Sequence, residues 1–406
     1  MDTSRAAVLG AGFQGVCVAL ELARRGIDVD LYDRNDACIT QAGARNEGKI
    51  HLGFVYANDA SFETAKLMAR GALAFGAALP RWLECGWSDL GLSTPHYYAV
   101  HRDSMLAPDA VLAHFAHVRD VVHELGAGCG YLGQDAHTVD FASEPLGDIY
   151  DPQSVAAVIR TDERSVNVKT IAALLRARVA AEPRIAFHSG CHVTGAARGD
   201  DAIRISFTRG GAPSNARYRQ VVNCLWDGKL PIDRQMAFLP PYRSLHRLKF
   251  GINLVLKQPN PSVPSITFVV GPFGDIVKFD ARCLYLSWYP VARTNISDAL
   301  ALPDWPRELH GEEADRMIDA TIAAFARLVV PMRGLQRGLF EQCSVAGGII
   351  LAAGETDIDD PASRLHARSA VGVRSADGYH SVDTGKYTLA PMYAIDVADR
   401  ICGMAR

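Results

Sequence analysis

The sequence predicts a mixed α/β protein in which a Rossmann-like domain is interleaved with a second domain rich in strands. Three observations support this prediction. The 406 residues exceed what one ordinary hydrophobic core holds. A glycine-rich turn at residues 10–15 joins an apolar strand to a helix, and residues 243–289 read as strands separated by Pro, Gly and Asn clusters. No linker divides the chain, so we expect it to cross between the two domains several times.

The expected elements follow one another along the chain. Residues 5–9 and 27–32 form strands around a helix that ends near Arg25, where Gly26 favours a helix stop. Further helices are expected at 60–83, 108–125, 166–181, 312–328 and 389–402. Further strands are expected at 49–56, 185–188, 203–207, 218–224, 248–256, 266–270, 276–279, 284–288 and 339–353, with a hairpin loop at 210–215.

Composition narrows the classes of function. The formal net charge of −3 gives no electrostatic case for binding nucleic acid. The nine cysteines are scattered without a CxxC pair, which fits a reducing compartment and argues against a zinc site. Glycines interrupt the apolar N-terminus, and no apolar run reaches about 18 residues. We therefore expect a soluble, cytoplasmic protein with no metal site, signal peptide or membrane span.

The turn at 10–15 has the spacing of a dinucleotide-binding motif. Gly10 permits the tight turn, Gly12 lets a pyrophosphate approach the backbone, and Gly15 lets the helix pack against the strand. The helix N-terminus offers free N–H groups and the positive end of its dipole to phosphate. Asp33, at the end of the second strand, can accept hydrogen bonds from an adenosine ribose. The expected nucleotide contacts are Gly10, Gly12, Phe13, Gln14, Gly15, Asp33 and Arg34.

Four segments, in this order along the chain, resemble the D-amino-acid-oxidase superfamily of flavoproteins, which includes glycine oxidase, sarcosine oxidase and 2-hydroxyglutarate oxidase. They are Gly10–Asp33, Asn46–Gly53, Val221–Cys224 and Gly385–Pro391. The second is similar to the Asn-x-Gly-x-Ile-His-x-Gly stretch of the hydroxyglutarate oxidase branch. These segments span most of the chain, whereas residues 243–289 match the superfamily only in their strand pattern.

The resemblance implies an FAD domain with a mixed sheet and a substrate domain with a large antiparallel sheet, with the flavin between them. We assign residues 1–75, 150–230 and 340–406 to the FAD domain, and residues 76–149 and 231–339 to the substrate domain. A helix N-terminus near Thr388, helped by Lys386, would stabilise negative charge on the reduced flavin. The further cofactor contacts that the resemblance implies are Arg45, Asn46, Gly385, Lys386, Tyr387, Thr388 and Leu389.

The reaction implied by the resemblance is hydride transfer from a C–H beside an amine or hydroxyl group to flavin N5. Oxygen or another acceptor then reoxidises the flavin. The implied substrates are a small amine, an amino acid or a 2-hydroxy acid. The sequence leaves open the substrate, the acceptor, the mode of FAD attachment and the oligomeric state.

Catalytic candidates are cationic or basic side chains near the motifs. His51 is a candidate base, because imidazole changes its charge near neutral pH, or a covalent tether for FAD. Arg45 suits bidentate binding of a carboxylate, and Lys49 is a second candidate for contact with FAD or an anionic substrate. By resemblance to sarcosine oxidase, Lys249 or Lys278 would assist the reaction with oxygen.

Aromatic side chains are candidates for the pocket wall, since they combine apolar faces with polar tips. In the strand that starts near Arg243, Arg247 and Lys249 share one face, while His246 and Leu248 share the other; one face is expected to look onto the flavin. The acidic run 357–360 reads as an exposed loop. The expected pocket residues are Tyr97, Tyr98, His246, Trp288 and Tyr289.

Two alternatives come from other classes. An NAD-dependent dehydrogenase would explain residues 10–33 but not the turn at Gly385–Pro391. A flavin-binding protein without turnover, serving as a sensor or assembly partner, would explain both, because a fold does not guarantee chemistry.

Overall fold

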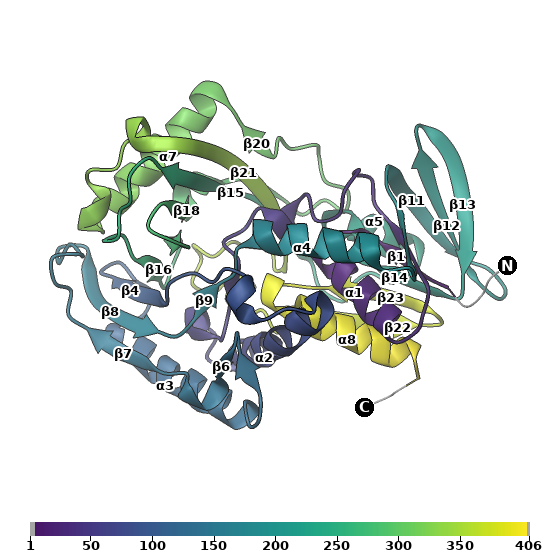
Figure 1. The fold of residues 1–406 in the computed structure, drawn as a ribbon, viewed down its shortest axis with the longest axis horizontal. Helices are drawn as coiled ribbons and strands as arrows, with labels where there is room; N and C mark the ends of the chain where they lie inside the picture. The colour runs from purple at the N-terminus through teal and green to yellow at the C-terminus, as the bar shows by residue number, and fades with distance from the viewer. Residues whose placement is uncertain (1–4, 404–406) are drawn as a thin grey trace.

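The computed structural model describes residues 5–403. Within this range, the strands form a six-stranded sheet, a ten-stranded sheet and three smaller sheets. Figure 1 shows the strands β1 (Ala6–Leu9) and β14 (Gln220–Asn223) of the six-stranded sheet on one side of the molecule. The strands β15 (Ser244–Leu256) and β21 (Phe340–Ala353) of the ten-stranded sheet lie on the other side. The chain passes between the two sheets repeatedly, which confirms the predicted mixed α/β fold of interleaved domains.

The six-stranded sheet is the Rossmann-like part. Its order is β10-β2-β1-β14-β23-β22, and all neighbours are parallel except β22 and β23. The short apolar run of β1 is fully buried, as expected for a central strand of a parallel sheet. The other strands are β2 (Val29–Tyr32), β10 (Ile185–His188), β22 (Gly372–Ala376) and β23 (Tyr379–Asp383).

Each face of this sheet has its own cover. Ala6 and Val8 of β1 pack into the helical core, whereas Ala7 and Leu9 face the opposite cluster, as alternation along a strand requires. The helices on the first face are α1 (Phe13–Arg24), α4 (Val168–Ala181) and α8 (Ala390–Ile401), and α2 (Glu63–Leu83) packs against α8 and α4 in the same core. The second face is covered by a three-stranded sheet of β11 (Cys191–Arg198), β12 (Ile203–Arg209) and β13 (Ala212–Tyr218).

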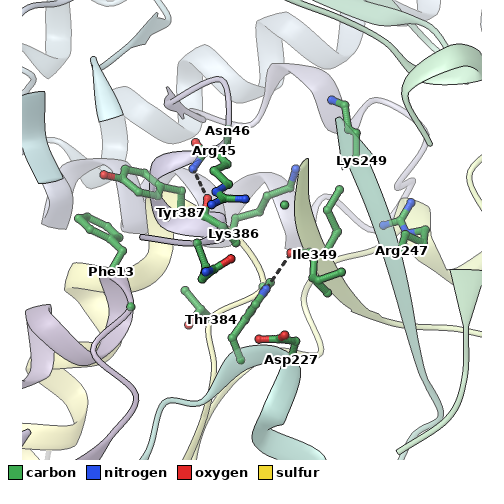
Figure 2. A pocket seen from close by; sticks show the side chains of 18 of the residues that line it. Phe13, Arg45, Asn46, Asp227, Arg247, Lys249, Ile349, Thr384, Lys386 and Tyr387 are labelled. Carbon is green, nitrogen blue, oxygen red and sulfur yellow. Dashed lines mark hydrogen bonds between the residues drawn. The ribbon is translucent and has the colours of Figure 1, made fainter. Parts of the chain in front are cut away.

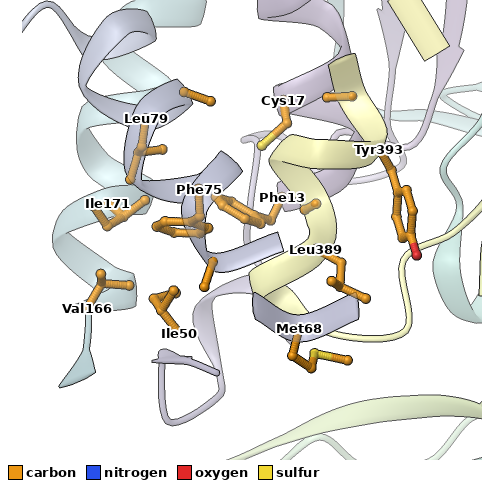
Figure 3. Packing of buried hydrophobic residues seen from close by; sticks show 14 of the residues in the cluster. Phe13, Cys17, Ile50, Met68, Phe75, Leu79, Val166, Ile171, Leu389 and Tyr393 are labelled. Atoms are coloured by element: carbon orange, nitrogen blue, oxygen red, sulfur yellow. The ribbon is translucent and has the colours of Figure 1, made fainter. Parts of the chain in front are cut away.

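The helical core brings the two ends of the chain together. Figure 3 shows Phe13 of α1, Phe75 of α2 and Leu389 beside α8 converging in one cluster. A Cβ on Gly71 of α2 would lie 2.4 Å from a side-chain carbon of Leu389, so glycine allows this close approach. The first turn of the nucleotide motif is thereby fixed beside the C-terminal turn.

The ten-stranded sheet is antiparallel apart from one parallel pair, β16 with β4. The helices α6 (Tyr289–Ala292) and α7 (Gly311–Ala326) pack on it. Its other strands are β4 (His96–His101), β7 (Phe141–Glu144), β8 (Val155–Thr161), β16 (Ser265–Val269), β17 (Gly274–Lys278), β18 (Cys283–Trp288), β19 (Arg293–Ser297) and β20 (Glu308–Leu309). The remaining elements are α3 (Pro108–Leu125), α5 (Lys229–Gln235), β3 (Lys49–Ile50), β9 (Arg164–Ser165), β5 (Gly130–Tyr131) and β6 (Gln134–Asp135).

The expected strand at 49–56 is wrong beyond its first two residues. Gly53 turns the chain with φ +127°, and Phe54–Tyr56 form a 3₁₀ turn. A Cβ on Gly53 would lie 3.0 Å from Ala65, so the chain bends here to pack against α2. The expected hairpin loop is also shorter than predicted, because only Gly210 and Gly211 form the turn and residues 212–215 belong to β13.

The domain boundaries remain a proposal. In the sheet assignments, β8 and β21 belong to the ten-stranded sheet, although their residues were placed with the FAD domain. Both strands pair with strands of the substrate side, β8 with β4 and β21 with β15. Across residues 5–403, the helices are all too short or too polar to cross a membrane.

Candidate active site

The turn between β1 and α1 has the geometry that its glycines predict. Gly10 has φ +95°, and a Cβ there would lie 2.7 Å from the carbonyl oxygen of Cys224. A Cβ on Gly15 would lie 1.8 Å from the Gly10 oxygen, so glycine is what lets α1 approach the strand. Gly15 itself lies behind the turn. A Cβ on Gly12, by contrast, would meet open space.

The N-terminus of α1 is free to bind an anion. It lies at one end of a cavity of about 660 Å³, which Gly10, Gly12 and Phe13 help to line. The helix has no side-chain cap and no acidic residue in its first turn. Its first N–H groups lack partners within the helix, so they remain available to a group in the cavity. These donors, together with the space in front of Gly12, fit a pyrophosphate.

Asp33 is held at the rim of this end. Its Oδ2 accepts a hydrogen bond from the Ala11 N–H at 2.7 Å, and its Oδ1 accepts one from the Asn35 N–H at 2.8 Å. The carboxylate therefore lies beside the glycine turn and lines the cavity. Arg34 also lines the cavity, and its Nη2 lies 3.6 Å from Oδ2 of Asp227.

The glycine turn and the C-terminal turn form one continuous wall. Gln14 accepts a hydrogen bond from the Thr384 hydroxyl at 2.9 Å and donates one to the Ala390 carbonyl at 3.1 Å. The ring of Tyr387 stacks on Phe13, with centroids 3.9 Å apart and an interplanar angle of 11°. Figure 2 shows this pair on one side of the cavity. The side chain of Gln14 is therefore used to join two motifs that lie at opposite ends of the sequence.

The loop before β3 also lines the cavity, but its side chains are already engaged. Asn46 donates to the Ala42 carbonyl at 2.8 Å and accepts from the Gly48 N–H at 2.8 Å. Arg45 donates to the carbonyls of Thr40 and Arg307 and pairs with a carboxylate oxygen of Glu308 at 2.9 Å. Because its guanidinium is occupied, the structure does not support Arg45 as the binder of a substrate carboxylate.

The opposite end of the cavity is formed by one face of β15. Arg247 and Lys249 line it (Figure 2). His246, on the other face of the strand, is buried outside the cavity. Arg247 is 1% exposed, and its Nη1 donates to Oδ1 of Asp357 at 2.7 Å and to the Tyr289 hydroxyl at 2.6 Å. The expectation that residues 357–360 form an exposed loop is wrong for Asp357, which is buried in this cluster.

A second buried guanidinium lies at this end. Arg368 lines the cavity, and its Nη1 is buried without a hydrogen-bond partner in residues 5–403. Burial, and then repulsion from Arg247, lower the pKa of Arg368 to about 10. Burial, and then repulsion from Arg368, lower the pKa of Lys386 to about 8. These shifts arise first from burial and then from the neighbouring cations, which Glu47 and Asp357 offset only in part.

Lys49 and Lys249 share one carboxylate. Lys49 is almost fully buried, donates to the Thr267 hydroxyl and pairs with Oδ1 of Asp275 at 3.0 Å. Lys249 lies 3.7 Å from Oδ2 of the same aspartate. All four residues line the cavity. Lys49 is therefore bound within the protein, and Lys249 is the freer of the two cations.

His51 lines the cavity beside Tyr56. Its Nδ1 lies 3.6 Å from Oε1 of Glu163, and its ring meets the ring of Tyr56 nearly edge-on at 5.6 Å. Burial, together with the nearby Lys386, lowers the pKa of His51 from its ordinary value. A neutral imidazole at neutral pH follows from that direction. The Tyr56 hydroxyl is buried and has no hydrogen-bond partner in residues 5–403.

Several predicted site residues lie outside the cavity. Most of them pack in the core, whereas Lys278 is only partly buried and donates to the Pro261 carbonyl at 2.7 Å. Tyr98 donates its hydroxyl proton to Glu163, while Tyr97, one residue earlier on the strand, faces the core of the substrate side. Trp288 packs against Phe325, with ring centroids 5.3 Å apart. The residues outside are Gly15, Tyr97, Tyr98, His246, Lys278, Trp288, Thr388 and Leu389.

Two of these residues still shape the site. Thr388 accepts a hydrogen bond from the His51 N–H at 2.9 Å and donates one to the Lys49 carbonyl at 3.2 Å. It thereby holds β3 against the C-terminal turn. Leu389 is fully buried and packs on Gly71.

Sequence reasoning did not select Tyr56, Glu163, Arg247, Asp357 or Arg368 as site residues. Of these five, only Arg247 had a visible signal, because it alternates with Lys249 on a predicted strand. The other four lie in turns or irregular segments, where a single sequence gives no periodic pattern that assigns a direction to a side chain.

Comparisons with known proteins agree with this geometry. The model of the family described as FAD dependent oxidoreductase (DAO) matches residues 5–280. No curated protein sequence matches the chain significantly.

Solved structures share the fold at low sequence identity. Iminodiacetate oxidase from Chelativorans sp. is 15% identical over 98% of this chain and 95% of its own, with a TM-score of 0.69. Glycine oxidase from Geobacillus kaustophilus is 14% identical over 97% and 93%, with a TM-score of 0.67. L-α-glycerophosphate oxidase from Mycoplasma pneumoniae, solved with FAD bound, is 13% identical over 98% and 94%, with a TM-score of 0.64.

The cofactor is FAD, as the family and the FAD-bound neighbours indicate, and nothing supports the NAD alternative. The residues present fit it, because uncapped helix N–H groups, the space before Gly12 and the acid at Asp33 meet in one cavity. With the family model covering more than half of the chain, the protein belongs to the FAD-dependent oxidoreductases of the D-amino-acid-oxidase type.

Proposed function

We propose that the protein oxidises a small carboxylate whose reacting carbon bears an amine or a hydroxyl group. The observation that carries this proposal is the unbalanced positive charge at the β15 end of the cavity. Arg247 and Arg293 share one carboxylate, that of Asp357, and Arg368 keeps a buried Nη1 without a partner. A buried cation without a counterion is costly, so an anionic substrate would supply the missing charge.

Arg368 and Arg247 would hold the substrate carboxylate, because a guanidinium gives a carboxylate strong, directed hydrogen bonds. The buried Tyr56 hydroxyl would add a neutral donor, since its pKa is raised by burial and it keeps its proton. Fixing the carboxylate fixes the C–H bond that must face the cofactor, and such orientation accounts for a large part of the barrier lowering in enzymes.

FAD would supply the hydride acceptor at this site, with oxygen or another acceptor taking up the electrons afterwards. Lys386 and the turn that carries it would place positive charge near the cofactor, where negative charge develops on reduction. Lys249 lies 3.7 Å from a carboxylate oxygen of Asp275 and is therefore held only loosely. It would be the cation that assists the reaction of the reduced cofactor with oxygen.

His51 would accept the proton from the substrate amine or hydroxyl group. Its lowered pKa keeps the imidazole neutral, which a base requires, and it lines the same cavity as Arg368 and Lys386. A covalent tether to FAD through the ring nitrogen that faces the cavity would exclude this role, because that nitrogen could not then accept the proton.

The first test is the visible spectrum of the purified protein before and after acid precipitation. Flavin bands that move to the supernatant would mean non-covalent FAD and leave His51 free to act as the base. Flavin bands that stay with the pellet would indicate a tether and exclude His51 as the base if H51Q releases them. A purified protein that lacks flavin and takes up no added FAD would contradict the cofactor assignment itself.

The second test is anaerobic bleaching of the flavin by matched pairs of compounds. Each amino acid or 2-hydroxy acid is compared with the amine or alcohol that lacks its carboxylate. We expect bleaching by members of the carboxylate set, and at least about 100-fold weaker apparent binding for the matched neutral compounds, which lose the charge-assisted contacts to Arg368 and Arg247. Equal bleaching within every pair would disprove the carboxylate class.

A further inference from the structure

We propose that Glu163, which lies outside the cavity, is a positioning residue that selects the tautomer of His51 with the proton on Nδ1. The other ring nitrogen, Nε2, is then left unprotonated to face the cavity. This inference deepens the proposed function and rests on it, because it assigns the means by which His51 becomes a base at a defined atom.

Glu163 is held rigidly in the core between β8 and β9. Its side chain is 0% exposed. Oε2 accepts a hydrogen bond from the Leu52 N–H at 2.7 Å, and Oε1 accepts one from the Tyr98 hydroxyl. With one donor on each oxygen, the carboxylate cannot turn without losing a buried hydrogen bond.

The carboxylate keeps its charge despite this burial. Burial by itself would raise the pKa of Glu163, but the contacts with His51, Lys49 and Tyr98 hold it below the ordinary value. A neutral acceptor would satisfy the Leu52 N–H equally well. Burying an ionised carboxylate costs desolvation free energy. The effect of this charge on the neighbouring imidazole of His51 therefore best explains why a glutamate stands here.

His51 is held at its backbone and at one ring edge. Its backbone N–H donates to the Thr388 hydroxyl at 2.9 Å, and its ring edge meets Tyr56. Its Nδ1 is buried without a hydrogen-bond partner in residues 5–403 and lies 3.6 Å from Oε1 of Glu163, so the carboxylate acts on the ring through its charge. An ionised carboxylate is an acceptor only, so it favours the imidazole tautomer with a hydrogen on Nδ1. Because the residue lines the cavity and Nδ1 is directed to the core, Nε2 is the nitrogen left for a substrate.

Glu163 opposes the effect of two lysines on the pKa of His51. Lys49 on β3 and Lys386 before α8 both lower the pKa of the imidazole, as burial does, while Glu163 raises it. The remaining titratable neighbours are Tyr56 on the 3₁₀ turn and His96 on β4, and burial raises the pKa of the first and lowers that of the second. Both neighbours are therefore neutral near pH 7. Asp275 is paired with Lys49 at 3.0 Å and Glu47 acts on Lys386, so Glu163 is the carboxylate whose own contact is with the His51 ring.

Histidine NMR of the FAD-loaded protein tests the positioning without any substrate. The protein is labelled with ¹⁵N-histidine, the two ring nitrogens are identified by long-range ¹H–¹⁵N couplings, and H51Q assigns the His51 signals by their loss. The test variant is E163Q, which keeps the size of the side chain and removes its charge. The matched control is E144Q, at a partly exposed glutamate on β7 whose Oε1 lies 3.5 Å from Nε of Arg160, outside the cavity.

In the wild type and in E144Q we expect a protonated Nδ1 and an unprotonated Nε2 above the pKa of His51. In E163Q the amide can donate to Nδ1, so we expect the proton to shift to Nε2 and the pKa of His51 to fall by about one unit. With a substrate found by bleaching, kcat of E163Q should fall about 100-fold at an unchanged KM, because a misdirected base no longer contributes.

Two results would overturn the inference. A wild-type His51 with its proton on Nε2 would do so without any variant, even if E163Q failed to fold. A folded, FAD-loaded E163Q with the wild-type tautomer and the wild-type pKa of His51 would also do so. Failure of the proposed function looks different, because the tautomer and its shift would be as expected while no carboxylate substrate bleaches the flavin.

Discussion

The two ends of the cavity present different kinds of chemical group. The nucleotide end uses the main chain, because Gly10, Gly12 and the uncapped N-terminus of α1 present backbone N–H groups within a few residues of sequence. The β15 end uses charged side chains from distant segments, with Arg247 on a strand and Arg368 in the irregular stretch before β22. Backbone donors serve any molecule that carries a pyrophosphate, whereas the second set suits one class of substrate.

The two ends are consequently sensitive to different changes. At the nucleotide end the limiting quantity is space, since a single methyl group on Gly15 would overlap the main chain. At the other end the limiting quantity is charge balance, since Arg368 and Lys386 both have lowered pKa values. Substitutions chosen on this basis separate stability from binding.

The largest effect is expected for G15A. Its Cβ would lie 1.8 Å from the Gly10 carbonyl oxygen, a main-chain atom that cannot move without opening the turn. We expect a loss of about 3 kcal/mol in the free energy of unfolding, the upper end for overpacking, with a corresponding loss of FAD. Urea unfolding of the apoprotein, followed by circular dichroism, measures the first quantity.

G12A is the matched variant three residues away. Its Cβ meets no atom within 4 Å, so the stability of the apoprotein should change by less than about 1 kcal/mol, the cost of alanine at a helix N-cap. Affinity for FAD should fall instead, because the methyl group occupies the space in front of the turn; quenching of flavin fluorescence measures it. Equal stability losses for G15A and G12A would contradict the distinction between packing and binding at this end.

At the β15 end, R368M should weaken substrate binding without lowering the free energy of unfolding, in contrast to G15A. Loss of a charge-assisted contact to the substrate carboxylate is expected to weaken binding by about 2 kcal/mol, roughly 30-fold in KM. The free energy of unfolding should stay the same or rise, because the variant removes a buried charge that lacks a counterion. Anaerobic bleaching kinetics and urea unfolding test the two parts separately.

R364M is the control for this variant, since Arg364 is exposed in the same loop. It should leave both KM and stability unchanged. A large loss of stability in R368M alone would mean that Arg368 is a structural ion rather than a binding group, and the carboxylate proposal would lose its main support.

This contrast also explains what could be predicted from the sequence. The glycines and Asp33 form a local pattern in which each residue has one physical task, so the pattern predicted the turn, the helix and the nucleotide end together. The strand alternation of β15 correctly grouped Arg247 with Lys249, but it did not indicate which face meets the cavity. His246 was chosen from the wrong face.

The residues that the sequence did not reveal depend on tertiary contacts. Arg368 enters the cavity because Asp357, eleven residues earlier in the same irregular segment, pairs with Arg247 of β15 and Arg293 of β19. Such pairing across long distances in sequence leaves no periodic trace in a single chain. For the same reason Arg45 looked free in the sequence, whereas Glu308 and the Arg307 carbonyl engage it in the fold.

A smaller effect is expected for Y289F. The Tyr289 hydroxyl accepts from Arg247 at 2.6 Å and donates to Asp357 at 2.7 Å, but these two residues also pair directly. We therefore expect a loss of about 1 kcal/mol in the free energy of unfolding, the value of one hydrogen bond. Y97F is the control, because the Tyr97 hydroxyl forms no hydrogen bond with residues 5–403 and should lose nothing. A loss above about 3 kcal/mol in Y289F would show that the direct ion pair does not hold the segment.

The smallest effect is a change of stability with pH that belongs to Lys386. Its pKa is lowered to about 8 in the fold, by burial and then by Arg368, against an ordinary value of 10.5. Between these values the unfolded chain binds more protons than the folded one, so stability rises with pH through this window. The cost of holding the ammonium charged is fully present below pH 8. The apoprotein should therefore gain stability relative to K386M between pH 8 and about 10.5, and K386M should be the more stable of the two below pH 8.

The slope of this pH dependence should be shallow, because the side chain borders an open cavity and is partly screened. Urea unfolding of both proteins at intervals across this range measures it. The nucleotide end adds no such dependence, since its donors are backbone N–H groups that do not titrate; parallel curves for the two proteins would show that charge is balanced at both ends.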